Sequence, residues 1–155
     1  MNKIVSREEA TGLELEIIRE FDAPVEMVFE AWTDVNALRS WMGPTGRSCP
    51  NAEANPVVEG AYSFPMVAEN GAVDTVVGHY TTIDPPYRLA FSWSWMQEDG
   101  TIGHPMHVTL HFEEIEGNRT RMKLLHINLA TPEARTNHNS GWVGCFDCLD
   151  GYLKN

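Results

Sequence analysis

The sequence is poor in basic residues. It holds 11 Lys and Arg against 22 Asp and Glu in 155 residues, which gives a formal net charge of -11 at pH 7. An acidic surface repels phosphate backbones and anionic lipid headgroups. We therefore expect neither nucleic acid nor a membrane surface as a partner.

Long apolar runs are also missing. No stretch approaches the roughly 18 apolar residues that a membrane-spanning helix requires. The first sixteen residues carry four acids and no uninterrupted apolar segment, so we expect no secretory signal or membrane anchor there. The three cysteines, Cys49, Cys145 and Cys148, are too few and odd in number for a disulfide framework. These absences lead us to expect a cytoplasmic protein.

Short motifs of catalysis and metal binding are absent as well. There is no G-x-S-x-G and no phosphate-binding loop. The pair Cys145-x-x-Cys148 lies well inside a predicted helix, with no second pair to complete a zinc site, which favours structural thiols. His107 and His111 would lie about 13 Å apart on a predicted strand, too far to share a metal ion, so we expect both to be exposed. We predict no metal, no cofactor and no catalytic residue, and an enzymatic role is left open.

The sequence does contain enough apolar material, 43% of its residues, for a single domain over residues 1–155. Residues 1–12 are expected to form a flexible N-terminal segment. Residues 13–22 alternate between apolar and acidic side chains, as in a half-buried strand. Pro24 begins a predicted helix, and a second short helix runs from Asp34 to Trp41.

From about residue 47 to residue 127 the pattern changes to short alternating runs separated by turn residues, which predicts an antiparallel meander. Its strands are expected at 49–56, 61–67, 73–83, 88–95, 106–114 and 119–127.

The last segment, from Thr131 onwards, has a helical period. Its apolar positions fall on one side of a long helix, which is the only element able to cover the concave face of a strongly curved sheet. Because a helix about 10 Å wide cannot fill the whole concavity, a gap is expected at one end. The order of elements predicts an α+β fold, in which a curved antiparallel β-sheet wraps around a long C-terminal α-helix and two short helices follow the first strand.

Several motifs together resemble a known family. They are Arg19-x-Phe21-x-Ala23-Pro24, Val28-Phe29-x-Ala31-Trp32-Thr33-Asp34, Trp41-Met42-Gly43-Pro44, Gly78-x-Tyr80, Pro85-Pro86-x-Arg88-Leu89 and Gly141-Trp142. The combination resembles the START-like (SRPBCC) superfamily, and within it the branch named for homology to the C-terminal domain of the heat-shock-protein-90 ATPase activator. The resemblance implies a helix-grip fold with a cavity between sheet and C-terminal helix. Where the family has a second tryptophan this chain has Met42, which we expect to alter the cavity mouth.

Two polar residues have inward parity on their predicted strands. For His126, the residues allow both a satisfied core histidine, which is favoured, and a polar anchor for a ligand. For Arg19, an internal salt bridge is favoured over a ligand contact.

Aromatic residues and methionines also gather on the inward faces. In the run from Phe91 to Trp95 the aromatic residues share one face, and Ser92 and Ser94 are left for solvent or a neighbouring layer. Such side chains with a few polar tips suit a small-molecule pocket. The predicted ligand-binding residues are Tyr62, Phe64, Met66, Tyr80, Phe91, Trp93, Trp95, Met106, Val108, His126, Trp142 and Phe146.

Three functions are compatible with these patterns. The first is non-enzymatic binding of a small hydrophobic or aromatic ligand; the residues alone leave dense packing without a cavity equally open, and the resemblance favours the cavity. The second is a chaperone-associated protein-binding regulator. The third is a cyclase or hydrolase that uses the same cavity. Both a monomer and a homodimer remain open.

Overall fold

The structure, a computed structural model, describes residues 11–155. Most of the predicted flexible segment 1–12 lies outside the described residues. At its described end, the backbone N–H of Thr11 donates to Oδ1 of Asn128 (2.8 Å), and the Thr11 hydroxyl donates to the carbonyl of Leu129 (2.6 Å). The elements in chain order are β1 (Glu14–Phe21), α1 (Val25–Thr33), α2 (Val35–Trp41), β2 (Arg47–Ser48), β3 (Glu53–Ala54), β4 (Ala61–Ala68), β5 (Val73–Asp84), β6 (Arg88–Trp95), β7 (Met106–Ile115), β8 (Arg119–Ile127) and α3 (Pro132–Leu153).

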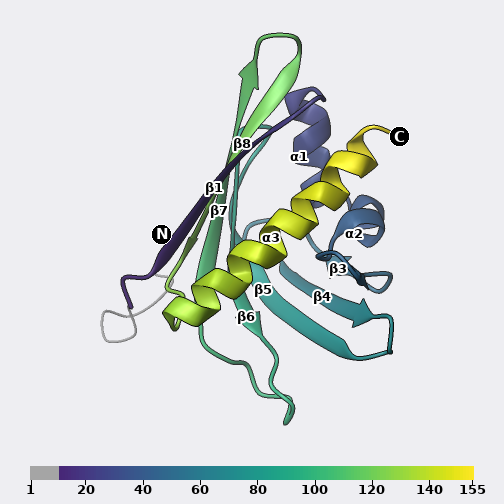
Figure 1. Cartoon of the computed structure of the whole chain (residues 1–155). Helices are drawn as coiled ribbons and strands as arrows, with labels where there is room; N and C mark the ends of the chain where they lie inside the picture. Colours follow the sequence, from purple (N-terminus) through teal and green to yellow (C-terminus); the bar gives the residue numbers. More distant parts are fainter. Residues whose placement is uncertain (1–10) are drawn as a thin grey trace.

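Within residues 11–155 the strands form one curled antiparallel sheet of eight strands, in the order β1-β8-β7-β6-β5-β4-β2, with β3 paired to β4. The first strand in the sequence therefore pairs with the last, Leu15 opposite His126 and Phe21 opposite Thr120. Figure 1 shows α3 running diagonally across the concave face, with α1 and α2 beside its C-terminal half. The α+β prediction is confirmed.

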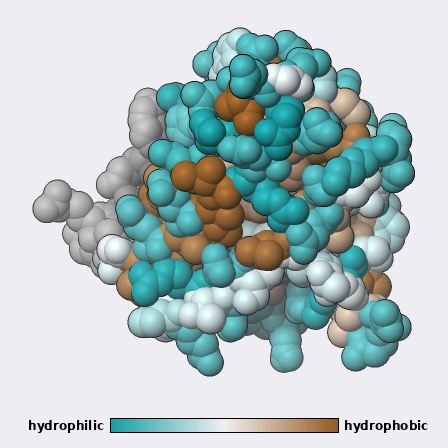
Figure 2. Space-filling view, turned by 45° about the horizontal axis from the view of Figure 1, so that its top comes forward, coloured by the Kyte–Doolittle hydropathy of each residue, from teal (hydrophilic) through white to brown (hydrophobic). Residues whose placement is uncertain are grey.

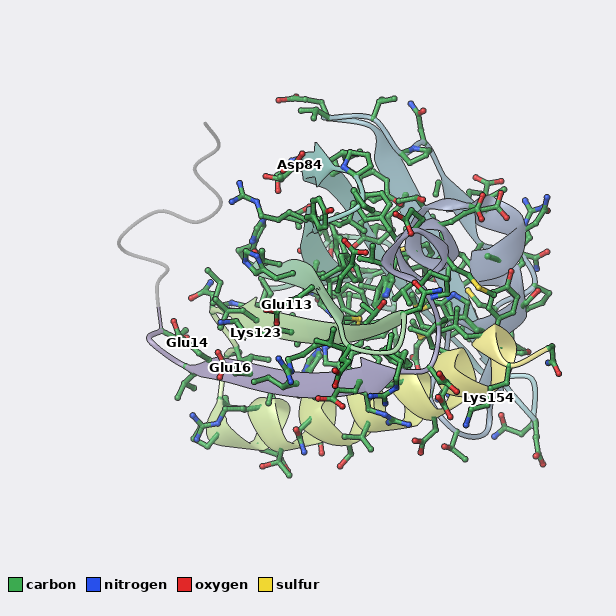
Figure 3. The ribbon with its side chains drawn as sticks, turned by 90° about the horizontal axis from the view of Figure 1, so that it is seen from above. Glu14, Glu16, Asp84, Glu113, Lys123 and Lys154 are labelled. Atoms are coloured by element: carbon green, nitrogen blue, oxygen red, sulfur yellow. The ribbon has the colours of Figure 1, made fainter. Side chains whose placement is uncertain are left out.

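The alternating pattern of β1 explains how the sheet obtains two different faces. Leu15 and Phe21 are buried, whereas the intervening acids are exposed. On the outer face Glu16 lies 3.5 Å from Nζ of Lys123 on the neighbouring β8, and Figure 3 shows the two side chains together. Exposed pairs of this kind stabilise a fold little, so the apolar face carries most of the stability of this edge.

Side-chain caps begin two of the helices. The carboxylate of Asp34 accepts from the backbone N–H of Ala37 (3.0 Å) at the start of α2, and the hydroxyl of Thr131 accepts from that of Ala134 (3.0 Å) at the start of α3. Pro132 follows Thr131 in the first turn of α3, where a missing N–H costs nothing. Both helices begin where the sequence predicts.

One predicted strand is wrong. Residues 49–52 form a turn between the short strands β2 and β3, because Pro50 has no backbone N–H to donate to a ladder, and of the predicted range only Glu53–Ala54 is a strand. The backbone N–H of Ala52 instead bonds the carbonyl of Cys49 (3.3 Å). Arg47, just before this turn, lies in β2 at the edge of the sheet beside β4.

Two side chains differ from their predicted surroundings. His107, expected to be exposed, is 7% exposed and lies 2.9 Å from the hydroxyl of Thr81, the residue at which the register between β5 and β6 shifts, and such an irregularity redirects a side chain. Arg19 pairs with Asp147 of α3 at 2.9 Å, but this ion pair is half-exposed and is therefore not internal.

Among residues 11–155, no helix has both the length and the apolar character needed to cross a bilayer. On the face shown in Figure 2, hydrophobic residues form separate patches among hydrophilic ones.

Candidate functional site

A cavity of about 530 Å³ lies between the first half of α3 and strands β2, β4, β5 and β6. Its wall is mostly apolar, with a few polar groups. The residues that line it are Pro44, Arg47, Met66, Asp74, Trp93, Trp95, Asn137, His138, Gly141, Trp142 and Cys145.

The helical side of the cavity is a stripe of small or polar residues. Asn137, Gly141 and Cys145 follow one another at intervals of four residues, so they face the same direction. A Cβ atom added at Gly141 would meet no atom of residues 11–155 within 4 Å, apart from the adjoining backbone of α3 itself. At the next glycine, Gly144, an added Cβ would come within 2.9 Å of the backbone nitrogen of Thr45. Gly141 thus faces open space, whereas Gly144 lets the segment after α2 pack closely against α3.

Three tryptophans form the aromatic wall. The ring centroids of Trp93 on β6 and Trp142 on α3 lie 4.8 Å apart, so the sheet and helix are in contact there. Trp95 meets Trp93 edge to face at 5.7 Å and is half-buried, whereas Trp93 and Trp142 are almost fully buried. The two tryptophans of β6 therefore contact α3 and also border a hollow beside it.

Two histidines hold two of these indoles in place. Nε1 of Trp142 donates to Nδ1 of His126 (3.0 Å), and Nε1 of Trp95 donates to Nε2 of His138 (3.1 Å). His138 donates its other ring nitrogen to the carbonyl of Ala134 (2.8 Å). Because each histidine accepts an N–H, both rings are neutral.

Burial lowers the pKa of both histidine rings. For His126 it is the main cause of a pKa well below the usual value, and the nearby His138 and His107 lower that pKa further. Burial also lowers the pKa of His138, against a smaller opposing effect of the Ala134 carbonyl. The two rings meet at 4.8 Å between centroids. They are a neutral pair that fixes two tryptophan orientations.

The thiol of Cys145 is also neutral. Burial raises the pKa of Cys145 to about 12, although a hydrogen bond from the backbone of Gly43 lowers it slightly. A thiol that stays protonated is a poor nucleophile and a poor metal ligand. Within residues 11–155, no three His, Cys, Asp or Glu side chains are grouped so as to hold a metal ion. The site as a whole can enclose an apolar molecule and orient a polar group on it.

The structure places four of the twelve predicted ligand-binding residues at the cavity: Met66, Trp93, Trp95 and Trp142. The other eight are buried in the core and do not line it. They are Tyr62, Phe64, Tyr80, Phe91, Met106, Val108, His126 and Phe146. His126 lies behind Trp142, with Nε2 3.3 Å from the sulfur of Met106, so it is a satisfied core histidine. Strand parity identifies inward side chains but cannot tell which of them meet a neighbour and which border a space.

Met42, expected to influence the cavity mouth, is 1% exposed and does not line the cavity, whereas Pro44 does. Cys145, expected as a structural thiol on the apolar side of the C-terminal helix, lines the cavity, and several other lining residues were not predicted. A signal existed for those on α3, because a glycine and polar residues on the inward stripe of a core helix indicate incomplete packing. The missed residues are Pro44, Arg47, Asp74, Asn137, His138 and Gly141.

The family model described as "Activator of Hsp90 ATPase homolog 1-like protein" matches residues 22–154. Among solved structures, the chain is similar to the AHSA1 protein from Silicibacter pomeroyi, with 28% identity, a TM-score of 0.83, and 92% of this chain and 98% of that one covered. A protein from Arthrobacter aurescens is 27% identical with a TM-score of 0.82, covering 92% and 87%. A protein from Chromobacterium violaceum shares the fold at 22% identity, with a TM-score of 0.79 and coverage of 92% and 99%. No protein of curated function matches the chain significantly by sequence.

Proposed function

Because the chain belongs to the family of Activator of Hsp90 ATPase homolog 1-like proteins, we propose that it works as a helix-grip domain that binds one small hydrophobic or aromatic molecule between its sheet and α3. The observation that carries this proposal is the cavity of about 530 Å³. Ligand sites in proteins are typically concave and mostly apolar, measure roughly 300–1,000 Å³ and contain a few polar groups.

The state of the polar side chains favours binding over catalysis. Both ring nitrogens of His138 are engaged, one by Trp95 and one by the carbonyl of Ala134, so neither is free for a substrate proton. The thiol of Cys145 is protonated, because burial raises its pKa to about 12. These groups act as wall and support, and the apolar rings supply the attraction for a ligand.

The test is a titration with N-phenyl-1-naphthylamine, a neutral molecule whose fluorescence rises in apolar surroundings. We expect saturable binding, in the micromolar range typical of an unoptimised apolar ligand. Gly141→Phe should weaken it about tenfold or more, because the new ring would extend into the open space beside Gly141.

The matched control is Gly151→Phe. Gly151 lies on the same helix, and an added Cβ there also meets no other part of residues 11–155 within 4 Å, but this residue is exposed and does not line the cavity. The control should bind the probe like the unaltered protein. Absence of saturable binding, or equal losses in the two variants, would contradict the proposal.

A further inference from the structure

Two charged side chains line the cavity among residues 11–155, Arg47 on β2 and Asp74 on β5. Nη1 of Arg47 lies 2.8 Å from Oδ2 of Asp74. The side chain of Asp74 is 64% exposed, whereas the rings of Trp93 and Trp142 are almost fully buried. The cavity is therefore amphipathic, with a charged end at solvent and an aromatic end inside.

The two charged side chains are not held equally well. Nη1 of Arg47 donates to the carbonyl of Met66 (3.2 Å) as well as to Asp74, and only 27% of the Arg47 side chain is exposed. Asp74 makes no side-chain hydrogen bond or ion pair within residues 11–155 other than the one to Arg47. The cation is anchored to the sheet, and its carboxylate partner is free to move into water.

Part of the hydrogen-bonding capacity of Arg47 is not used within residues 11–155. A guanidinium has five N–H groups, and the contacts above use only those on Nη1. Its Nε and Nη2 atoms make no hydrogen bond to any residue between 11 and 155. A fork of free N–H groups on a planar cation matches the two oxygens of a carboxylate.

We propose, on the basis of the proposed function, that the ligand is an aromatic carboxylate. Its ring lies against Trp93 and Trp95, and its carboxylate binds Arg47 at the solvent end of the cavity. Asp74 pairs with Arg47 when no ligand is bound, and this ion pair breaks when the carboxylate of the ligand binds Arg47. Because Asp74 is mostly exposed, its release into water costs little.

The same ion pair could also be interpreted as a site where Asp74 binds a cationic ligand. Such a ligand would have to lie beside the guanidinium of Arg47, which the Met66 carbonyl holds in place and which would repel it. The net charge of -11 attracts cations at long range. At physiological salt, however, interactions between exposed charges are screened beyond about 8 Å, so the contact with Arg47 decides which charge binds in the cavity. The arrangement thus favours an anion.

The first experiment compares three ligands with the same ring by calorimetry at pH 7.5: 1-naphthylacetate, its neutral amide 1-naphthylacetamide, and the cation 1-naphthylmethylamine. We expect the acid to bind about tenfold more tightly than the amide, since a charge-assisted bidentate contact replaces a neutral one. The amine should bind most weakly. Equal affinities for acid and amide, or tightest binding of the amine, would overturn the proposal.

The second experiment uses two variants with opposite expected effects. Arg47→Gln should remove the preference for the acid over the amide, whereas Asp74→Asn should raise the affinity for the acid several-fold by removing its competitor. If the ion pair only stabilises the wall, the two variants change the binding of acid and amide alike, which is the contrary result. If Arg47→Gln fails to fold by circular dichroism, Asp74→Asn still decides, because its side chain is exposed.

These outcomes separate the two proposals. If N-phenyl-1-naphthylamine shows no saturable binding, the proposed function fails. If the naphthyl ligands bind without regard to charge, only the assignment of a carboxylate ligand fails.

Discussion

Along α3, the inward-facing residues Phe146, Leu149 and Leu153 are packed into the core, whereas the inward-facing residues between Asn137 and Cys145 border a cavity. In the packed half, Phe146 meets Phe21 at 6.5 Å and Trp32 at 6.2 Å between ring centroids, both edge to face. In the hollow half, the same face of the helix carries Asn137, His138 and Gly141. One helix thus crosses one sheet with two different outcomes.

The difference arises from side-chain volume and from what supports each half. The packed half lies beside α1 and α2, which supply large apolar side chains such as Trp32. The hollow half faces the end of the sheet where β4, β5 and β2 lie, and its inward stripe is too small to reach them. The cavity is therefore a local consequence of a few residues on α3.

The largest expected effect is loss of packing in the packed half. Leu149→Ala should lower the free energy of unfolding by about 3–5 kcal/mol, because Leu149 is fully buried and its removal leaves a new void. Met66→Ala should cost about 2 kcal/mol or less, because Met66 already borders empty space. Urea unfolding of both variants measures this difference. Equal losses would mean that the two halves are packed alike.

Acid should weaken the folded state through its buried histidines. The folded-state pKa of His107 is about 4, lowered mainly by burial, so the unfolded chain binds the proton first as the pH falls below about 6.5. His107 alone should therefore cost about 2 kcal/mol of stability between pH 6.5 and pH 5, and the loss continues towards pH 4. His126 and His138 act in the same direction.

A variant in each half distinguishes their contributions to this pH dependence. His138→Gln, in the hollow half, should reduce the loss of stability between pH 7 and pH 5. Leu149→Ala, in the packed half, should keep the full loss at a lower overall stability. Urea unfolding midpoints at the two pH values are the measurement. If His138→Gln loses as much stability between pH 7 and pH 5 as the unaltered protein, the ring of His138 does not contribute to the pH dependence.

A smaller effect should come from the indole hydrogen bonds. Trp142→Phe leaves Nδ1 of His126 without its donor, whereas Trp32 Nε1 has no partner within residues 11–155, so Trp32→Phe loses no hydrogen bond. The two changes remove the same atoms. Trp142→Phe should therefore be more destabilising by about 1 kcal/mol, as judged by urea unfolding. The reverse order would contradict the assigned role of His126.

The smallest effect should come from the glycines of α3. Gly141→Ala should stabilise the protein by about 0.5–1 kcal/mol, because alanine favours the helix and its Cβ meets open space. Gly144→Ala should instead destabilise, because its Cβ would come within 2.9 Å of the Thr45 nitrogen. Thermal unfolding of the pair tests whether open space begins at Gly141.

The order and type of the elements were predictable because their patterns are local. The strands Arg88–Trp95 and Arg119–Ile127 begin and end where their alternation predicts, since one face of each is buried. The break at Pro50 was missed because a run of mixed residues was taken as continuous. At the site, three tryptophans and Met66 were predicted from parity and helix period, but the charged pair Arg47 and Asp74 was not.

By itself, the sequence determined the α+β class, the long C-terminal helix and the inward set of aromatic residues, because periodicity is a property of neighbouring residues. Only the tertiary structure decided that Trp95 borders a cavity while Phe91 fills the core, and that His126 supports Trp142 from behind. It also brought together Arg47 on β2 and Asp74 on β5, two strands that β4 separates. Whether a space stays open depends on how segments distant in the sequence meet, and no local pattern specifies that distance.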